Sequence, residues 1–237
     1  MSNLLAIFAH PDDEAFAVAG TLSRHHRSGG RLALITATDG TAGRTSGIRA
    51  DDREEVGRIR RRELLAAAGI LGVDRVFALG LADGGLQAMD GDDLVNPLVG
   101  LIRDIRPEVV VTFGPEGGPN THADHRAVCS AATAAFFLAG NETVLLDAGA
   151  AWRSSRLYYL TWTGLSGPRR AVAGLPVTCR VDISAEVETK RAAFAAHLSQ
   201  QHHIGHFEDE LRPVEEFHLA GGVPQPAPLI ADLFAGL

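Results

Sequence analysis

The stretch NLLAIFAHPDDEAF (residues 3–16) joins an apolar run directly to a cluster of ionisable groups. Residues 4–9 are all apolar, which is typical of a strand that is buried on both faces of a parallel sheet. His10 follows at once, and three carboxylates occupy positions 12–14. A tight turn needs one Asp at most, so three adjacent acids beside an imidazole exceed what the turn requires. This junction predicts a central strand that leads into a functional loop.

The same alternation of strand and helix continues along the chain. Further strands are predicted at residues 32–38, 75–81, 109–113 and 157–162. Helical periodicity is found at residues 14–27, 50–71, 93–103, 123–138 and 184–200, the last with Ser184 as its N-cap. Strands that alternate with helices in this way predict an α/β fold with a mostly parallel sheet and helices on both faces. Because neither an internal repeat nor a low-complexity linker is found, we expect one domain over residues 1–237.

Composition narrows the classes of partner. The 237 residues carry a formal net charge of −7, and nucleic acids and anionic membranes favour basic surfaces. No apolar run approaches the roughly 18 residues of a membrane span, and the first apolar run is too short for a secretion signal. We therefore expect a cytoplasmic protein with a small-molecule partner, with no nucleic acid and no membrane span. The sequence leaves the oligomeric state open, a homo-oligomer included.

Polar loops follow four of the predicted strands. Asp39-Gly40 follows the second strand, and Asp83-Gly84-Gly85 follows the third. The fourth strand leads into GPEGGPNTHADH, residues 114–125, which ends at the start of a predicted helix. Because ligands bind beyond the carboxyl ends of parallel strands, these loops and the first one are expected to surround one site.

Two histidines of the fourth loop can join the first loop at a metal ion. His122 and His125 are three residues apart at a helix start, a spacing that places them on one face. His10, Asp13 and His125 together give two imidazoles and one carboxylate, a ligand set that leaves a catalytic Zn²⁺ one open position. A divalent cation would also offset the repulsion among the acids. Fe²⁺ or another divalent metal would suit the same ligands, which also describe the facial triad of non-haem iron enzymes.

Six segments carry a family resemblance. AHPDDE (9–14) and HADH (122–125) resemble the two metal motifs of the LmbE-like, or PIG-L-like, zinc-dependent N-acetylglucosaminyl deacetylases. Supporting similarity is found in RRRELLAAAGILGV (60–73), LGLADGGL (79–86), KRAAFAAHLSQ (190–200) and EEFHL (215–219). The resemblance implies a Rossmann-like fold and the removal of an acetyl group from a GlcNAc-containing small molecule. It also implies zinc bound by His10, Asp13 and His125.

The resemblance further implies roles for the neighbouring residues. Asp12 would act as general base, and His122 would donate a proton to the oxyanion or the leaving amine. This agrees with the chemistry of amide hydrolysis, which needs a nucleophile at neutral pH and a group to accept its proton. We expect the Asp124 carboxylate to bond the other nitrogen of His122 and raise its pKa. Glu14 is expected to favour the positive end of a helix dipole.

Two further residues are predicted to contact the substrate. Arg60 and Asp83 match family positions that face the sugar, so both are predicted to bind substrate. Pro119-Asn120 replace the usual tyrosine region of the loop.

An amidase that cleaves another amide, such as a thiol conjugate, would use the same site. A non-haem iron enzyme and a non-catalytic sugar-binding protein are the remaining alternatives, and neither needs Asp12 as a base.

Overall fold

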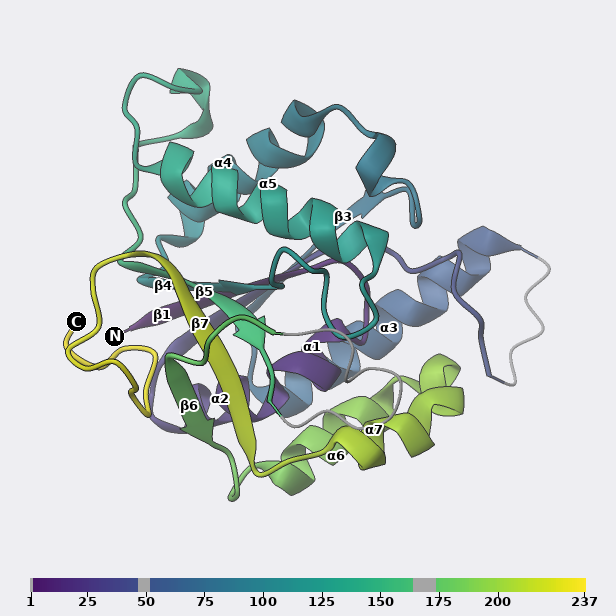
Figure 1. Cartoon of the computed structure of the whole chain (residues 1–237). Coiled ribbons are helices and arrows are strands. Elements are labelled where there is room, and N and C mark those ends of the chain that lie inside the picture. The colour runs from purple at the N-terminus through teal and green to yellow at the C-terminus, as the bar shows by residue number, and fades with distance from the viewer. Residues whose placement is uncertain (1, 47–51, 164–173) are drawn as a thin grey trace.

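The strands of the protein form one sheet in the order β3-β2-β1-β4-β5-β7-β6, with seven strands in the described residues (Figure 1). The computed structural model describes residues 2–46, 52–163 and 174–237. The parallel strands are β1 (Asn3–Phe8), β2 (Arg31–Thr38), β3 (Arg75–Leu81), β4 (Val109–Thr112) and β5 (Arg156–Thr161). This confirms the predicted α/β fold with a mostly parallel, open sheet.

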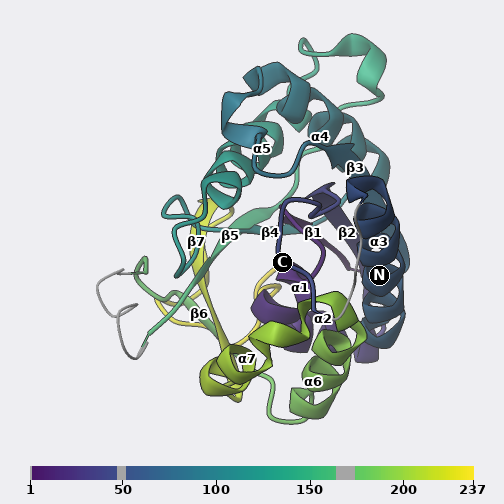
Figure 2. The same ribbon diagram turned by 90° about the vertical axis from the view of Figure 1, so that its right-hand side faces the viewer.

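Helices cover both faces of the sheet (Figures 1 and 2). One face carries α4 (Gly91–Ile105) and α5 (Ala123–Ala139). The other face carries α1 (Asp13–Ala17), α2 (Ala19–Arg27), α3 (Arg53–Leu71), α6 (Val187–Ala196) and α7 (Ile204–Glu210). Short 3-10 turns lie at η1 (Leu86–Ala88), η2 (Leu146–Ala148) and η4 (Leu198–His203).

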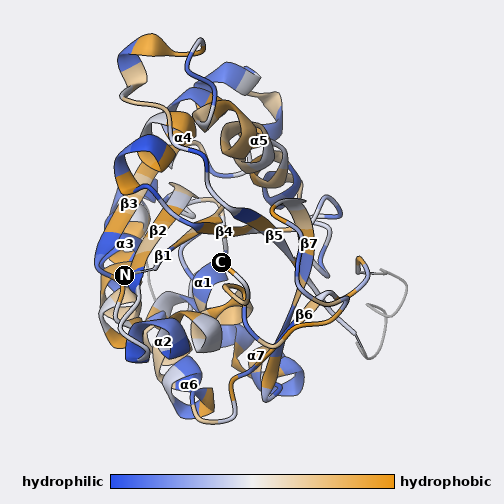
Figure 3. Cartoon of the chain, turned by 90° about the vertical axis from the view of Figure 1, so that its left-hand side faces the viewer, coloured by the Kyte–Doolittle hydropathy of each residue, from blue (hydrophilic) through white to orange (hydrophobic). Residues whose placement is uncertain are grey.

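The hydrophobic core lies on the two faces of the central strands. Five of the six residues of β1 are buried, and so are all four of β4. Figure 3 shows this as hydrophobic colouring in β1, β2 and β4, while α2 and α6 carry hydrophilic segments. Burial on both faces explains why these strands are continuous apolar runs. Among the described residues, no helix is both long and apolar enough to cross a membrane.

Strand β1 lies at the point where the strand order reverses. β2 pairs with one edge of β1 and β4 with the other, so that Leu4 lies opposite both Leu32 and Val109. The crevice of a doubly wound sheet opens at such a switch point, beyond the carboxyl ends of the strands. The loops after β1 and β4 are thus brought together, although more than a hundred residues separate them in the sequence.

The predicted helix at residues 14–27 is divided into α1 and α2 at Val18. The break gives α2 its own N-terminus, where the Glu215 carboxylate accepts hydrogen bonds from the backbone N–H groups of Gly20 (3.0 Å) and Thr21 (2.8 Å). A carboxylate at this position satisfies helix donors and favours the dipole. Glu215 is distant in sequence, so the local pattern did not predict the break.

The predicted helix at residues 184–200 is shorter than expected. Ser184 is not the N-cap, because its backbone N–H and hydroxyl both donate to Asp182 Oδ1 in a turn. α6 spans Val187–Ala196 and continues beyond His197 as η4. The first residues of the helix predicted at 50–71 lie outside the described residues, and the rest form α3.

Two antiparallel strands complete the sheet. β7 (Val214–Gly222) lies between β5 and β6 (Cys179–Asp182) and runs antiparallel to both. The near-terminal strand at residues 215–219 that the family resemblance implied is thus confirmed. β6 was not predicted, since four residues that alternate between buried and exposed carry little pattern.

Candidate metal centre and active site

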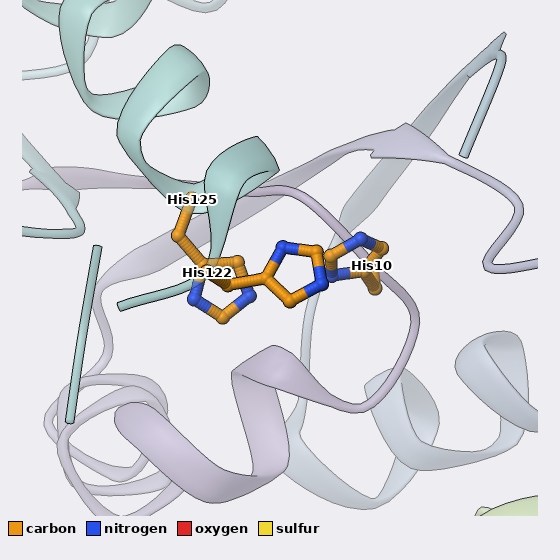
Figure 4. Close-up of side chains that lie close together, drawn as sticks. All are labelled: His10, His122 and His125. Atoms are coloured by element: carbon orange, nitrogen blue, oxygen red, sulfur yellow. The ribbon is translucent and has the colours of Figure 1, made fainter. Parts of the chain in front are cut away.

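The predicted loops line one cavity of about 680 Å³ at the carboxyl edge of the sheet. His10, Asp12 and Asp13 come from the loop after β1 and the start of α1, whereas His122 and His125 come from the start of α5. Figure 4 shows the three histidines side by side, with His122 and His125 on the helix and His10 on the facing loop. The structure therefore brings the predicted catalytic and metal-binding residues together.

Asp13 lies between the two imidazoles predicted to share a metal with it. Its Oδ2 is 3.4 Å from His10 Nδ1, and its Oδ1 is 3.3 Å from His125 Nε2. The Asp13 carboxylate also accepts the backbone N–H of His10 at 2.7 Å. All three residues are buried, with exposed fractions of 6–9%. A buried carboxylate flanked by two imidazole nitrogens supplies the donor set that a divalent cation prefers.

The outer nitrogen of each imidazole faces an acceptor. His10 Nε2 lies 3.1 Å from Asp83 Oδ1 and 3.3 Å from Asp124 Oδ2. His125 Nδ1 lies 3.1 Å from the carbonyl oxygen of Gly117. Metal-binding histidines commonly donate their second N–H to a carboxylate or a backbone carbonyl, which fixes the tautomer and turns the free nitrogen to the metal. These contacts leave His10 Nδ1 and His125 Nε2 directed toward Asp13, so the residues fit a metal.

Alternative ligand groups overlap with the predicted one. His10, His122 and His125 have possible ligand atoms within 4.8 Å of one another, and so do His10, Asp83 and Asp124. His10 belongs to both groups, through its position between the carboxylates and the other imidazoles. His10 is therefore common to both possible ligand groups, and His122 lies close enough to the predicted ligands to belong to one of these groups.

The charges of this cluster favour a cation. Burial lowers the pKa of His10, but hydrogen bonds to Asp124, Asp13 and Asp83 outweigh it and hold that pKa well above its usual value. Burial raises the pKa of Asp13, but the neighbouring His125 and His10 hold it well below its usual value. Both shifts have one physical cause, which is that the buried carboxylates stabilise positive charge between them. A divalent cation bound at this position would be stabilised by the same carboxylates.

Asp12 lies beside the predicted metal ligands as the N-cap of α1. Its Oδ1 accepts a hydrogen bond from Arg60 Nη2 at 3.2 Å. Burial raises the pKa of Asp12 to about 6, although the Arg60 charge opposes the increase. A carboxylate whose pKa is close to neutral suits a general base.

His122 is the N-cap of α5. Its Nδ1 accepts the backbone N–H of Asp124 at 3.2 Å, so a neutral ring carries its proton on Nε2. The predicted bond from the Asp124 carboxylate to His122 is wrong, because that carboxylate faces His10 and accepts N–H groups of Gly84 and Leu86. Burial and the charges of His10 and His125 lower the pKa of His122, contrary to the expected increase.

The predicted substrate-binding residues already have protein partners. Arg60 is only 4% exposed and donates to the carbonyl oxygens of Gly40 (2.6 Å) and Pro11 as well as to Asp12. Asp83 accepts the Ala42 backbone N–H at 2.7 Å in addition to its contact with His10. Both residues line the cavity, so contact with a substrate remains a prediction. The support that Asp83 gives to His10 was not predicted from the sequence.

The sequence also missed a buried pair behind Asp12. Glu14 Oε1 lies 2.6 Å from His197 Nε2, and both side chains are fully buried. Glu14 Oε2 accepts the backbone N–H of Asp12 at 3.1 Å. Although Glu14 lies in the first turn of α1 as expected, its carboxylate is committed to these two partners. The motif KRAAFAAHLSQ carried His197 but not its partner.

Aromatic side chains also line the cavity. Phe16, Trp162, His203 and His206 line it, and the Phe16 ring packs against His203, His206 and Phe207. His203 and His206 therefore form part of the cavity wall.

Comparisons with known proteins identify relatives along most of the chain. The family model described as "PIG-L: GlcNAc-PI de-N-acetylase" matches residues 5–136. A 1D-myo-inositol 2-acetamido-2-deoxy-alpha-D-glucopyranoside deacetylase of Rhodococcus jostii is 31% identical, over 83% of this chain and 81% of its own length.

Two solved structures share the fold. The N,N'-diacetylchitobiose deacetylase of Pyrococcus horikoshii has a TM-score of 0.75 at 20% identity, over 92% of this chain and 83% of its own. GalB of Pseudomonas putida, a 4-carboxy-2-hydroxymuconate hydratase, has a TM-score of 0.79 at 18% identity, over 96% and 99%. Because a deacetylase and a hydratase share it, the fold alone does not decide the reaction. The family match over more than half of the chain and the identity to the Rhodococcus protein place this chain in the PIG-L family of GlcNAc-PI de-N-acetylases.

Proposed function

We propose that this protein hydrolyses the N-acetyl amide of a GlcNAc-containing small molecule, with a zinc ion held by His10, Asp13 and His125. The observation that carries the proposal is the Asp13 carboxylate between His10 Nδ1 and His125 Nε2, with Asp12 beside it. The protein belongs to a family of amide hydrolases that act on N-acetyl groups, and its relatives at about 30% identity are named for a GlcNAc-inositol substrate. We therefore propose a GlcNAc-containing substrate of the same kind for this protein.

The residues divide the hydrolysis among them. A bound zinc ion supplies Lewis acidity, which lowers the pKa of water and polarises a carbonyl group. Asp12 accepts the proton of the attacking water at Oδ2, while Arg60 holds Oδ1. His122 donates a hydrogen bond from Nε2–H to the negative charge that develops on the acetyl oxygen.

The products follow from proton and bond balance. Water adds to the acetyl carbon, and the bond between that carbon and the amide nitrogen breaks. The proton that Asp12 took is passed to the amide nitrogen, which leaves as the primary amine. The second proton of the water stays on the acetyl group, which leaves as acetic acid and ionises to acetate in solution, where the amine takes up the released proton. The reaction therefore needs no partner beyond substrate and water.

A direct test measures metal and products together. Purified protein is analysed for metal and incubated with 1D-myo-inositol 2-acetamido-2-deoxy-alpha-D-glucopyranoside and with N,N'-diacetylchitobiose. We expect equal amounts of acetate and primary amine, a loss of activity with a chelator, and recovery with Zn²⁺. Asp13→Ala should lose the metal. Zinc-loaded protein that releases no amine from either substrate would overturn the proposed substrate class, and recovery with Fe²⁺ alone would overturn zinc.

A further inference from the structure

Asp12 has an unusual backbone conformation. Among the described residues, four that are not glycine have a positive φ, and three of these lie at φ 50–55° in the ordinary left-handed region. Asp12 lies well beyond that region, at φ 110° and ψ −25°. Such a conformation persists only where surrounding contacts hold it, and it is found preferentially at functional sites.

Glu14 supplies one of these contacts. Its Oε2 accepts the backbone N–H of Asp12 at 3.1 Å. The carbonyl oxygen of Asp12 accepts the N–H groups of Ala15 (3.0 Å) and Phe16 (3.1 Å), as expected of an N-cap. The peptide groups on both sides of the Asp12 Cα are therefore held, which fixes the direction of its Cα–Cβ bond, while Arg60 holds Oδ1 of the carboxylate itself.

His197 in turn holds Glu14. The distance from its Nε2 to Glu14 Oε1 is 2.6 Å, and both side chains are 0% exposed. The other ring nitrogen, Nδ1, is buried and has no hydrogen-bond partner in the described part of the chain. Glu14 is thus the hydrogen-bond partner to which the imidazole is committed, and the contact joins the C-cap of α6 to the first turn of α1.

We infer that Glu14 and His197 are positioning residues that hold the Asp12 carboxylate in place for proton transfer. The inference rests on the proposed function, in which Asp12 accepts the proton. The path runs from the His197 imidazole through the Glu14 carboxylate to the Asp12 backbone. Neither Glu14 nor His197 lines the cavity, so both act through Asp12 and not on the substrate.

A role in stability alone makes different predictions, and Glu63 provides the matched control. Glu63 is a buried carboxylate that accepts the backbone N–H (2.8 Å) and hydroxyl (2.6 Å) of Ser199, two residues after His197. It ties α3 to the same segment and makes no contact with Asp12. Glu63→Gln therefore tests whether loosening this segment is enough to lower turnover.

The test is a double-mutant cycle on the zinc-loaded enzyme, with kcat, KM, zinc content and Tm measured for each variant. Misplacing a catalytic group by about 1 Å can cost roughly 100-fold in rate. Glu14→Ala should lower kcat by about this factor, with KM and zinc content unchanged. Glu14→Gln should recover at least about ten-fold of the loss, because its amide oxygen can still accept the Asp12 N–H. In an Asp12→Asn background, Glu14→Ala should change kcat by less than about three-fold.

Outcomes separate this inference from the proposed function. Equal effects of Glu14→Ala with and without Asp12 would overturn the positioning role, and so would an equal loss of kcat in Glu63→Gln at the same Tm. If Glu14→Ala does not fold, His197→Asn takes its place in the cycle, with about a ten-fold loss expected in the presence of Asp12 only. A wild-type protein that is inactive on all substrates would overturn the proposed function and this inference with it.

Discussion

Replacement of Asp124 by asparagine should weaken zinc binding while all three proposed ligands remain. The Asp124 side chain is fully buried, and its Oδ2 accepts from Gly84 N (2.7 Å) and faces His10 Nε2 (3.3 Å). Its Oδ1 accepts the N–H of Leu86 at 3.2 Å. Asparagine has one acceptor oxygen, so its NH₂ group must face a donor in either orientation. His10 also loses a negative charge that raises its basicity.

The magnitude follows from the number of contacts that remain. Changes to the outer partner of a metal-binding histidine typically cost 10- to 100-fold in affinity. Asp83 still contacts His10 Nε2 at 3.1 Å, so the zinc Kd should rise about 10- to 100-fold, or about 1.4–2.7 kcal/mol, and not more. Competition with a chromophoric chelator measures this Kd. Glu142→Gln, on an exposed loop, controls for the loss of one charge. A Kd within about three-fold of wild type would refute the reasoning.

Three further predictions concern the base, its partner and stability. Asp12→Asn should retain zinc and lose about 10²- to 10⁴-fold in kcat; near-normal turnover would place the base elsewhere. Arg60→Ala should lower kcat as well as raise KM, because Arg60 holds Asp12 Oδ1, and a change in KM alone would limit it to substrate binding. Arg156 is fully buried and donates to four carbonyl oxygens at 2.9–3.1 Å, so Arg156→Lys, with three donors, should lower the free energy of unfolding by about 2–4 kcal/mol in urea denaturation. Arg75→Lys, in an exposed ion pair, should change it by less than about 1 kcal/mol, and equal effects would contradict the argument.

The sequence predicted the parallel strands and the meeting of the proposed metal-binding residues for physical reasons that are local. A strand buried on both faces must be a continuous apolar run, and residues 4–9 are such a run. His10 and His125 each follow a strand, and the topology places those strands next to each other. Once β1 and β4 are recognised as parallel neighbours, the convergence of their loops needs no further information.

The partners of buried polar groups could not be predicted in this way. The Asp124 carboxylate was assigned to its neighbour His122, yet its partners are His10 and two backbone N–H groups 38 and 40 residues away. The N-terminus of α2 that follows the break at Val18 likewise has its N–H groups bonded by Glu215, on a strand near the end of the chain. The packed structure determines which buried polar groups form hydrogen bonds with each other, because an unsatisfied buried group is costly. The hydrophobic periodicity of the sequence does not contain this information.

The three consecutive acids after β1 are compatible with one another because each faces a different partner. Asp13 lies between His10 and His125, Asp12 contacts Arg60, and Glu14 contacts His197. With helical dihedrals throughout, residues 12–14 would follow each other around a single turn, whereas the positive φ of Asp12 changes the chain direction just before α1 begins. The unusual backbone at this residue therefore separates the proposed proton acceptor from the proposed metal ligand that is its immediate neighbour. The three carboxylates thereby face separate partners although they are consecutive in the sequence.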